Sequence, residues 1–181
     1  MKKAAFILVL GITIVSIVSH KLAAQNGFVP ADSLIVNIDS YVNTMVETEG
    51  FIAHVCGVDG KKMKLMSDNG EVIVIIPNDT TGFDYSLNKK RIKLFGLVKE
   101  ERLSEQYIDE QEEAKSLLCH VDRRPCKDEK WINAKVEAGV ADSMSKKDIE
   151  ALRQKKEQQG KGYVSIVLIV CEKYEVIESN K

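Results

Sequence analysis

The sequence lacks the short motifs that mark several common enzyme classes. It contains no Gly-x-Ser-x-Gly, no phosphate-binding loop, no His-Glu-x-x-His and no Cys-x-x-Cys. These patterns are typical of α/β-hydrolases, nucleotide-binding enzymes, zinc proteases and thioredoxin-like oxidoreductases. Cys119 and His120 are adjacent in the sequence, so their side chains are expected to point in different directions and not to form a nucleophile–base dyad. We therefore do not expect an enzyme.

An excess of positive charge is also missing. The chain has 26 Lys and Arg against 27 Asp and Glu, a net charge of −1. Nucleic-acid-binding domains usually carry a basic patch or stripe, so no nucleic-acid partner is expected. The short basic runs at Lys89–Arg91 and Lys146–Lys147 are interpreted as solvated faces.

No apolar run is long enough to span a bilayer. Residues Ala4–Val18 are apolar but number only about 15, against the ~20 that a membrane-spanning helix needs. Lys2 and Lys3 precede this run, and Leu22-Ala23-Ala24 follows it as a small-residue cleavage site. We predict a signal peptide over residues 1–24, a periplasmic or secreted location, and no stable membrane insertion after cleavage. An uncleaved N-terminal anchor is the alternative.

Beyond the cleavage site, hydrophobic periodicity predicts one domain. Residues 25–45 are expected to be a leader with a short helix near Asp39–Asn43, and residues 46–178 the folded domain. Period-two alternation and turns such as Asp59-Gly60 predict strands, and period-3.6 patterns with caps predict helices. The expected strands are 51–56, 62–67, 71–76, 91–98 and 163–177, and the expected helices are 104–118, 128–138 and 145–160.

This order of elements predicts the fold class. A meander of four short strands cannot close on itself, and the last strand supplies the closure. We therefore predict a mainly β protein with α-helices: a small OB-like five-stranded β-barrel with helices inserted before the last strand. The usual OB arrangement has its helix between strands three and four, whereas the helices here come after strand four. Gly96, in the middle of strand four, indicates a bend or a close backbone approach.

Several sequence stretches resemble one protein family. They are Val46-Glu-Thr-Glu-Gly50, His54-Val-Cys56, Gly60-Lys-Lys-Met63, the acidic segment 102–114 and the closing strand with Cys171. Over residues 34–178 the chain resembles an uncharacterised family of exported bacterial OB-like domains, near the type called domain of unknown function 4920. The resemblance implies a fold and an exported location but no established activity. Val58 stands where the family often has a further histidine.

His54 and Cys56 are the first candidate metal ligands. Residues two apart in a strand project from the same side, about 6.5–7 Å apart at the backbone, and alternation also puts Ile52 on that face. An imidazole nitrogen and a thiolate can then converge on one metal ion at roughly 2.0–2.3 Å. Met63 is expected nearly opposite His54 across the hairpin. These soft donors favour Cu(I) over hard cations, so we predict a site for a soft transition metal, copper or zinc, at His54, Cys56 and Met63.

A second candidate group consists of Cys119, His120 and Cys126. It can form its own site or supply further ligands to Zn(II). The alternative is structural. An exported chain with four cysteines favours disulfides, and Cys119 and Cys126 suit a local one because they flank a loop with a proline. Cys56 and Cys171 are then buried in strands or bridged.

These observations leave several functions open. The first is an exported binding module for a soft metal ion. The second is a structural or interaction domain with a disulfide-stabilised barrel, no metal, and an unknown protein partner. OB barrels often bind oligomers on strands two and three, where Lys62, Lys64 and Met66 would be displayed. A thiol redox protein is the third, and it requires a labile disulfide.

Overall fold

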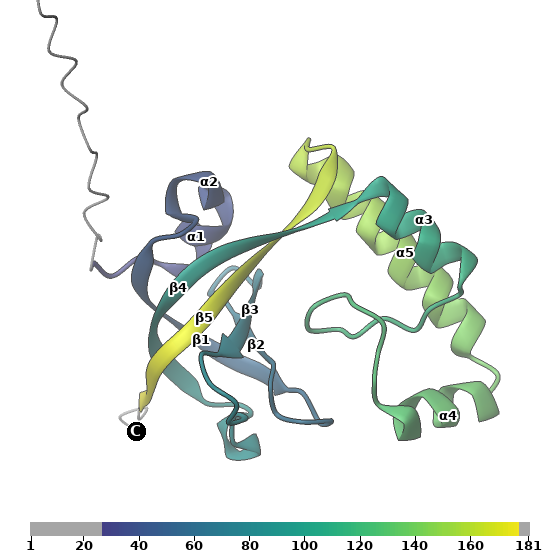
Figure 1. Cartoon of the computed structure of the whole chain (residues 1–181), viewed down its shortest axis with the longest axis horizontal. Coiled ribbons are helices and arrows are strands. Elements are labelled where there is room, and N and C mark those ends of the chain that lie inside the picture. Colours follow the sequence, from purple (N-terminus) through teal and green to yellow (C-terminus); the bar gives the residue numbers. More distant parts are fainter. Residues whose placement is uncertain (1–26, 178–181) are drawn as a thin grey trace, which may run out of the picture.

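The computed structural model describes residues 27–177 and contains a closed five-stranded β-barrel (Figure 1). Its strands are β1 (Met45–Val55), β2 (Met63–Met66), β3 (Val72–Pro77), β4 (Arg91–Ser104) and β5 (Tyr163–Ile177). Their order around the barrel is β1-β2-β3-β5-β4, with β4 also paired to β1. Only β3 and β5 run parallel within this described sheet. The predicted OB-like barrel with helices before its last strand is confirmed.

The barrel interior follows the alternation of the strands. In β4 the inward side chains are Ile92, Leu94 and Val98, and Gly96 lies between them, as predicted. At Gly96 the pairing of β4 with β5 shifts by one residue, and an added Cβ would collide with the backbone of Val170. Glycine is therefore required at this position by the close approach of the two strands.

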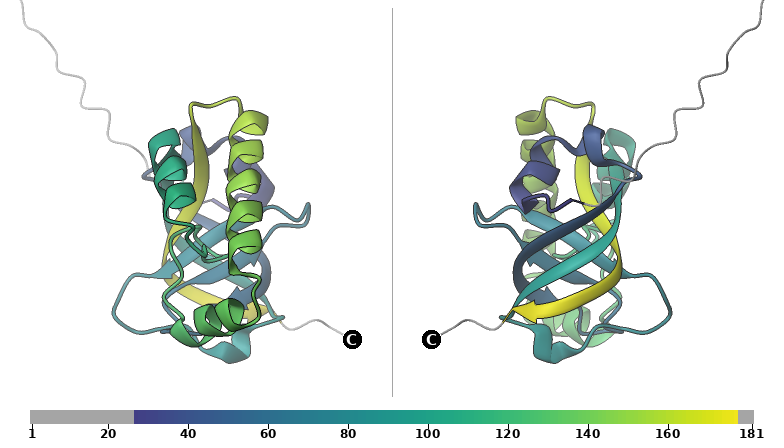
Figure 2. Two further views of the ribbon diagram at one scale, coloured as in Figure 1. Left: turned by 90° about the vertical axis from the view of Figure 1, so that its right-hand side faces the viewer. Right: turned by 90° about the vertical axis from the view of Figure 1, so that its left-hand side faces the viewer.

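The segment before β1 belongs to the fold. It forms two short helices, α1 (Ala31–Val36) and α2 (Ile38–Tyr41), at one end of the barrel (Figure 2). Leu34 and Ile38 are buried in the barrel core, and the Val29 amide donates to the Glu47 carbonyl over 2.7 Å. Part of the segment 25–45, predicted to be a leader before the folded domain, thus packs against one end of the barrel.

β4 and β5 extend beyond the barrel as a two-stranded arm that carries the larger helices (Figure 1). These helices are α3 (Glu105–Glu113), α4 (Glu129–Glu137) and α5 (Ala141–Gln159), whereas the connection from β3 to β4 holds only a 3₁₀ turn, η1 (Tyr85–Leu87). Ser104 and Asp128 cap α3 and α4. The predicted start of α5 at Ser145 is wrong: the helix begins at Ala141, and Ser145 is a buried residue inside it.

A second hydrophobic core lies between the arm and the outside of the barrel. Its members come from β3, β4, β5, α3, α5 and the loop between α3 and α4: Val74, Leu103, Ile108, Leu118, Cys119, Val121, Ile149, Leu152, Val164 and Ile166. This core holds the α3–α4 loop against the barrel. The loop lies between the barrel and the helices in Figure 1.

The predicted signal peptide over residues 1–24 lies outside the described residues. Between residues 27 and 177, no helix combines the length and the apolar character that crossing a bilayer requires.

Candidate functional site

A bulge in β1 decides where His54 points. Ile52 pairs with Leu65 and His54 pairs with Lys64, so Ala53 has no partner of its own on β2. An extra residue in one strand reverses the alternation beyond it. Ile52 and Val55 therefore both lie in the barrel core, whereas His54 lies outside it. The prediction that Ile52 and His54 share a face is wrong, because a period-two pattern does not show where a bulge falls.

The same bulge removes Met63 from the candidate metal site. Met63 pairs with Val55, not with His54, and its side chain is completely buried in the barrel core. Its thioether packs among apolar side chains and does not face His54. The predicted ligand set of His54, Cys56 and Met63 is corrected to His54 and Cys56 on this strand.

The second candidate group lies on the loop between α3 and α4, which folds as a tight hairpin. The Cys119 amide donates to the Arg124 carbonyl over 2.7 Å, and the Cys126 amide donates to the Leu117 carbonyl over 2.8 Å. Arg123 adopts a left-handed conformation at the turn, with φ of 61°. This register puts Cys119 and Cys126 on the same side of the hairpin as diagonal neighbours.

The fold brings the two candidate groups to one cavity of about 250 Å³. The β1–β2 connection forms one wall, and the α3–α4 loop with the start of α4 forms the other. The lining side chains include two imidazoles, three thiols and the only tryptophan of the chain: His54, Cys56, Cys119, His120, Cys126 and Trp131. The sequence presented these donors as two separate groups, and the tertiary structure joins them.

The two imidazoles lie directly against each other. The ring centroids of His54 and His120 are 4.3 Å apart, and the planes are inclined by 59°. Burial lowers the pKa of His54, and the charge of Lys64 lowers it further. The pKa of His120 is lowered as well. The largest cause is the partial removal of its ring from water, and the charges of His54 and of nearby cations lower the pKa further. Both rings are therefore kept neutral, which is the form that binds metal ions.

An ion pair joins the two walls of the cavity. Lys62 of the β1–β2 connection donates to Asp122 of the loop over 2.6 Å, and its Nζ lies 3.9 Å from the Cys119 sulfur. Burial raises the pKa of the Cys119 thiol, while Lys62 acts in the opposite direction. Burial alone would lower the pKa of Lys62, but Asp122 and the nearby thiols raise it. Lys62 is thus a fixed positive charge beside a thiol.

All four cysteines of the chain lie in the described residues, and all four are free thiols. The local disulfide that the structural alternative places between Cys119 and Cys126 is not formed in this structure. Cys171 lies apart from the cavity, in the barrel core. Burial raises its pKa to about 11, so it stays a protonated thiol.

The cavity gathers donors without holding them in a finished coordination sphere. Across residues 27–177, no three His, Cys, Asp or Glu side chains are already placed to hold a metal ion. A metal would have to draw these side chains together.

Lys62 and Asp122 also belong to the site, because their ion pair joins its two walls. No local sequence signal identifies this pair, since 60 positions separate the two residues.

Comparison with family models, curated proteins and solved structures finds no match. The resemblance to the domain of unknown function 4920 type therefore stays a prediction.

Proposed function

We propose that this chain is an exported binding module for a soft transition metal ion, copper or zinc. The observation that supports the proposal best is the meeting of His54 and Cys56 with Cys119, His120 and Cys126 in one cavity. Two histidines and three cysteines from a strand and a distant loop are a donor set that suits these ions. The role is binding, with no catalytic step assigned.

The surroundings of the donors set the protonation states that a metal ion would meet. The two histidines are neutral at neutral pH, because their pKa values are lowered. The Cys119 thiol has a raised pKa, so metal binding must displace its proton, and Lys62 then lies next to the thiolate. Since bound metal replaces protons, the affinity is expected to rise with pH until the thiols are ionised.

The corrected donor set changes the expected selectivity. Met63 supplied the thioether that favoured Cu(I), and it lies in the barrel core. Thiolate and imidazole donors suit tetrahedral Zn(II) as well as Cu(I). Both ions therefore belong in the test.

Native mass spectrometry of the exported protein, isolated without added metal or reductant, is the first measurement. We expect a copper or zinc adduct. Titration of the reduced, metal-free protein with Zn(II) and with Cu(I) under anaerobic conditions then gives the affinity. Trp131 lines the cavity and is the only tryptophan, so its fluorescence reports the binding directly.

Cys171 serves as the control, because it is the cysteine that does not line the cavity. We expect Cys56→Ala and Cys119→Ala to weaken binding by at least about tenfold, the effect of losing one strong interaction. Cys171→Ala removes a buried thiol outside the cavity and should leave the affinity unchanged. Unchanged affinity in the cavity variants would contradict the proposal. A mass two protons short without an adduct would indicate a disulfide and favour the structural or redox alternatives.

A further inference from the structure

A second cavity, of about 80 Å³, shares His120 with the first. It lies between β2, the α3–α4 loop, α5 and the start of β5. Its apolar part is formed by Val72, Val121, Leu152, Val164 and Ile166. Three cationic side chains also line it: Lys64 from β2, Arg123 from the loop and Lys155 from α5. Three elements that are distant in sequence thus each contribute one positive charge.

The negative charges around this cavity do not balance the positive ones. Arg123 donates to Asp148 over 3.2 Å. Lys64 and Lys155 form no ion pair: among the described residues, no carboxylate oxygen lies within 4.0 Å of either ammonium group. Glu71 is near enough to influence Lys155 but does not pair with it.

The protein holds these cations together at a cost. Burial lowers the pKa of Lys155; Glu71 opposes this effect in part, and Arg123 adds a smaller lowering of the pKa. Burial also lowers the pKa of Lys64, followed by the charges of Arg123 and Lys155. Like charges that are partly removed from water destabilise a fold unless an anion compensates them. The arrangement therefore suits a ligand with more than one negative charge.

We propose that this cavity binds a phosphate group, either as the free ion or as the end of a phosphorylated small molecule. Two lysines and the guanidinium donors of Arg123 that Asp148 does not use match phosphate oxygens. A water molecule needs roughly 10–15 Å³ of such space, so the cavity holds a handful of heavy atoms, as in a tetrahedral oxyanion. This site shares only His120 with the proposed metal site, and its lysines are not metal donors.

Calorimetric titration in chloride buffer tests the proposal, with inorganic phosphate and phenyl phosphate as the two probes. We expect saturable binding of at least one probe to the wild-type protein. Lys64→Gln and Lys155→Gln should each weaken it by about tenfold, the effect of losing one charge-assisted hydrogen bond. Tighter binding of phenyl phosphate would assign the cavity to a phosphorylated molecule, and tighter binding of phosphate would assign it to the free ion.

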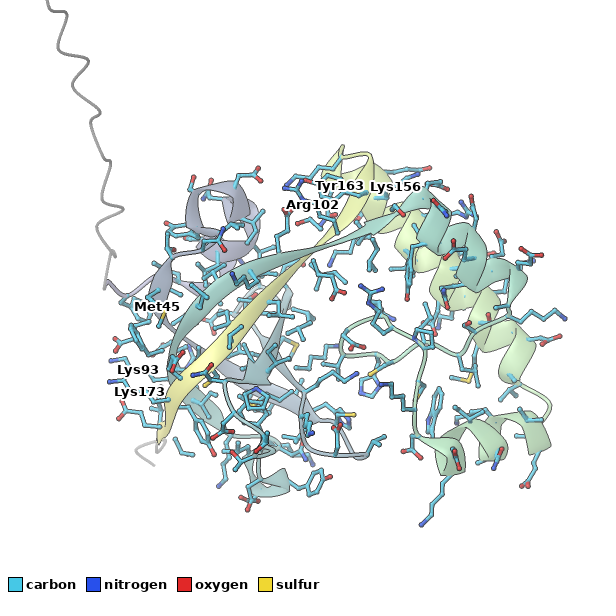
Figure 3. The ribbon with its side chains drawn as sticks, viewed as in Figure 1. Met45, Lys93, Arg102, Lys156, Tyr163 and Lys173 are labelled. Carbon is cyan, nitrogen blue, oxygen red and sulfur yellow. The ribbon has the colours of Figure 1, made fainter. Side chains whose placement is uncertain are left out.

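Lys156→Gln is the matched control. Lys156 is the neighbour of Lys155 on α5, but it pairs with Glu105 of α3 at the outer end of the arm (Figure 3). Its replacement removes the same charge from the same helix without touching the cavity. Phosphate binding should be unchanged in this variant. Equal weakening in Lys155→Gln and Lys156→Gln would mean a diffuse charge effect and overturn the proposal.

Stability measurements add a signature that a merely structural lysine does not produce. Without phosphate, Lys155→Gln should raise the urea midpoint of unfolding, because it removes a partly buried positive charge whose burial is not fully compensated. Phosphate should raise the midpoint of the wild type and not that of the variant. Absence of binding by both probes, or binding that survives both cavity variants, overturns the proposal. Cys56→Ala removes a thiol of the larger cavity only and should bind phosphate normally, so the outcome is independent of the metal test.

Discussion

The barrel and the arm bury similar apolar side chains but collect them in different ways. The barrel core takes alternate residues from neighbouring strands, such as Ile73 and Ile75 of β3. The second core takes one to three residues from each of many elements, among them Ile108 of α3 and Ile149 of α5. The barrel is thus specified by a local pattern, whereas the arm depends on docking. Both cavities lie along the boundary where the two regions meet.

The largest expected effect separates the two cores. Ile75→Ala and Ile149→Ala each remove a buried side chain and should lower the free energy of unfolding by about 2–5 kcal/mol. In the barrel variant, Trp131 fluorescence and far-UV circular dichroism should report one urea transition. In the arm variant the Trp131 transition should come first, because docking of the arm is weakened. Coincident transitions in Ile149→Ala would show that barrel and arm unfold as one unit.

Two glycines, one in the barrel and one in the arm, test whether the close approach of β4 and β5 requires a residue without a side chain. Gly96→Ala places a Cβ against the Val170 carbonyl oxygen in the barrel, and we expect a loss of about 3 kcal/mol, at the upper end of overpacking effects. Gly162→Ala, at the outer end of the arm, meets open space. Its unfolding free energy should stay within about 0.5 kcal/mol of the wild type. Chemical denaturation of both variants measures the difference, and equal losses would contradict the assigned approach of β4 and β5.

The ion pair between the two regions should have an intermediate effect. Asp122→Asn leaves the partly buried Lys62 without its counter-charge and should cost about 2 kcal/mol. Lys62→Gln should cost a similar amount, and the double variant less than the sum of the two. A double-mutant cycle from urea unfolding measures this coupling. Strict additivity would mean that the pair does not join the loop to the barrel.

The smallest expected effect is a pH dependence of the stability, caused by the two histidines where the barrel and the arm meet. The folded pKa values of His54 and His120 lie below the ordinary 6.5, owing first to burial and then to nearby charges. The unfolded chain therefore binds more protons once the pH falls below 6.5, and stability should decrease from there towards the folded pKa values, with no contribution at higher pH. Urea midpoints in phosphate-free chloride buffer measure this. The double variant His54→Asn, His120→Asn should show a flatter profile, and an unchanged slope would contradict the assignment.

Some of the site could be predicted from residue spacing. His54 and Cys56 share a face because the spacing of two holds beyond the bulge, from the end of β1 into the residue that follows it, and both line the larger cavity. The assignment of Met63 failed because the bulge at Ala53 shifts the register by one residue. In a strand, a shift of one residue moves every later side chain to the opposite face. No sequence pattern on either side of Ala53 marks that position.

The sequence by itself determined the barrel: alternation, the Asp-Gly turns and the valine- and isoleucine-rich last strand predict five strands, with helices before the fifth. These signals are local, because each depends on residues a few positions apart. Only the tertiary structure decided that the α3–α4 loop docks on the barrel. This docking joins His54 to His120, and the packing of α5 beside it brings Lys155 to the same cavity as Lys64, in both cases across more than 60 positions. Contacts at such separations depend on how the completed arm packs, and no periodicity within a segment encodes them.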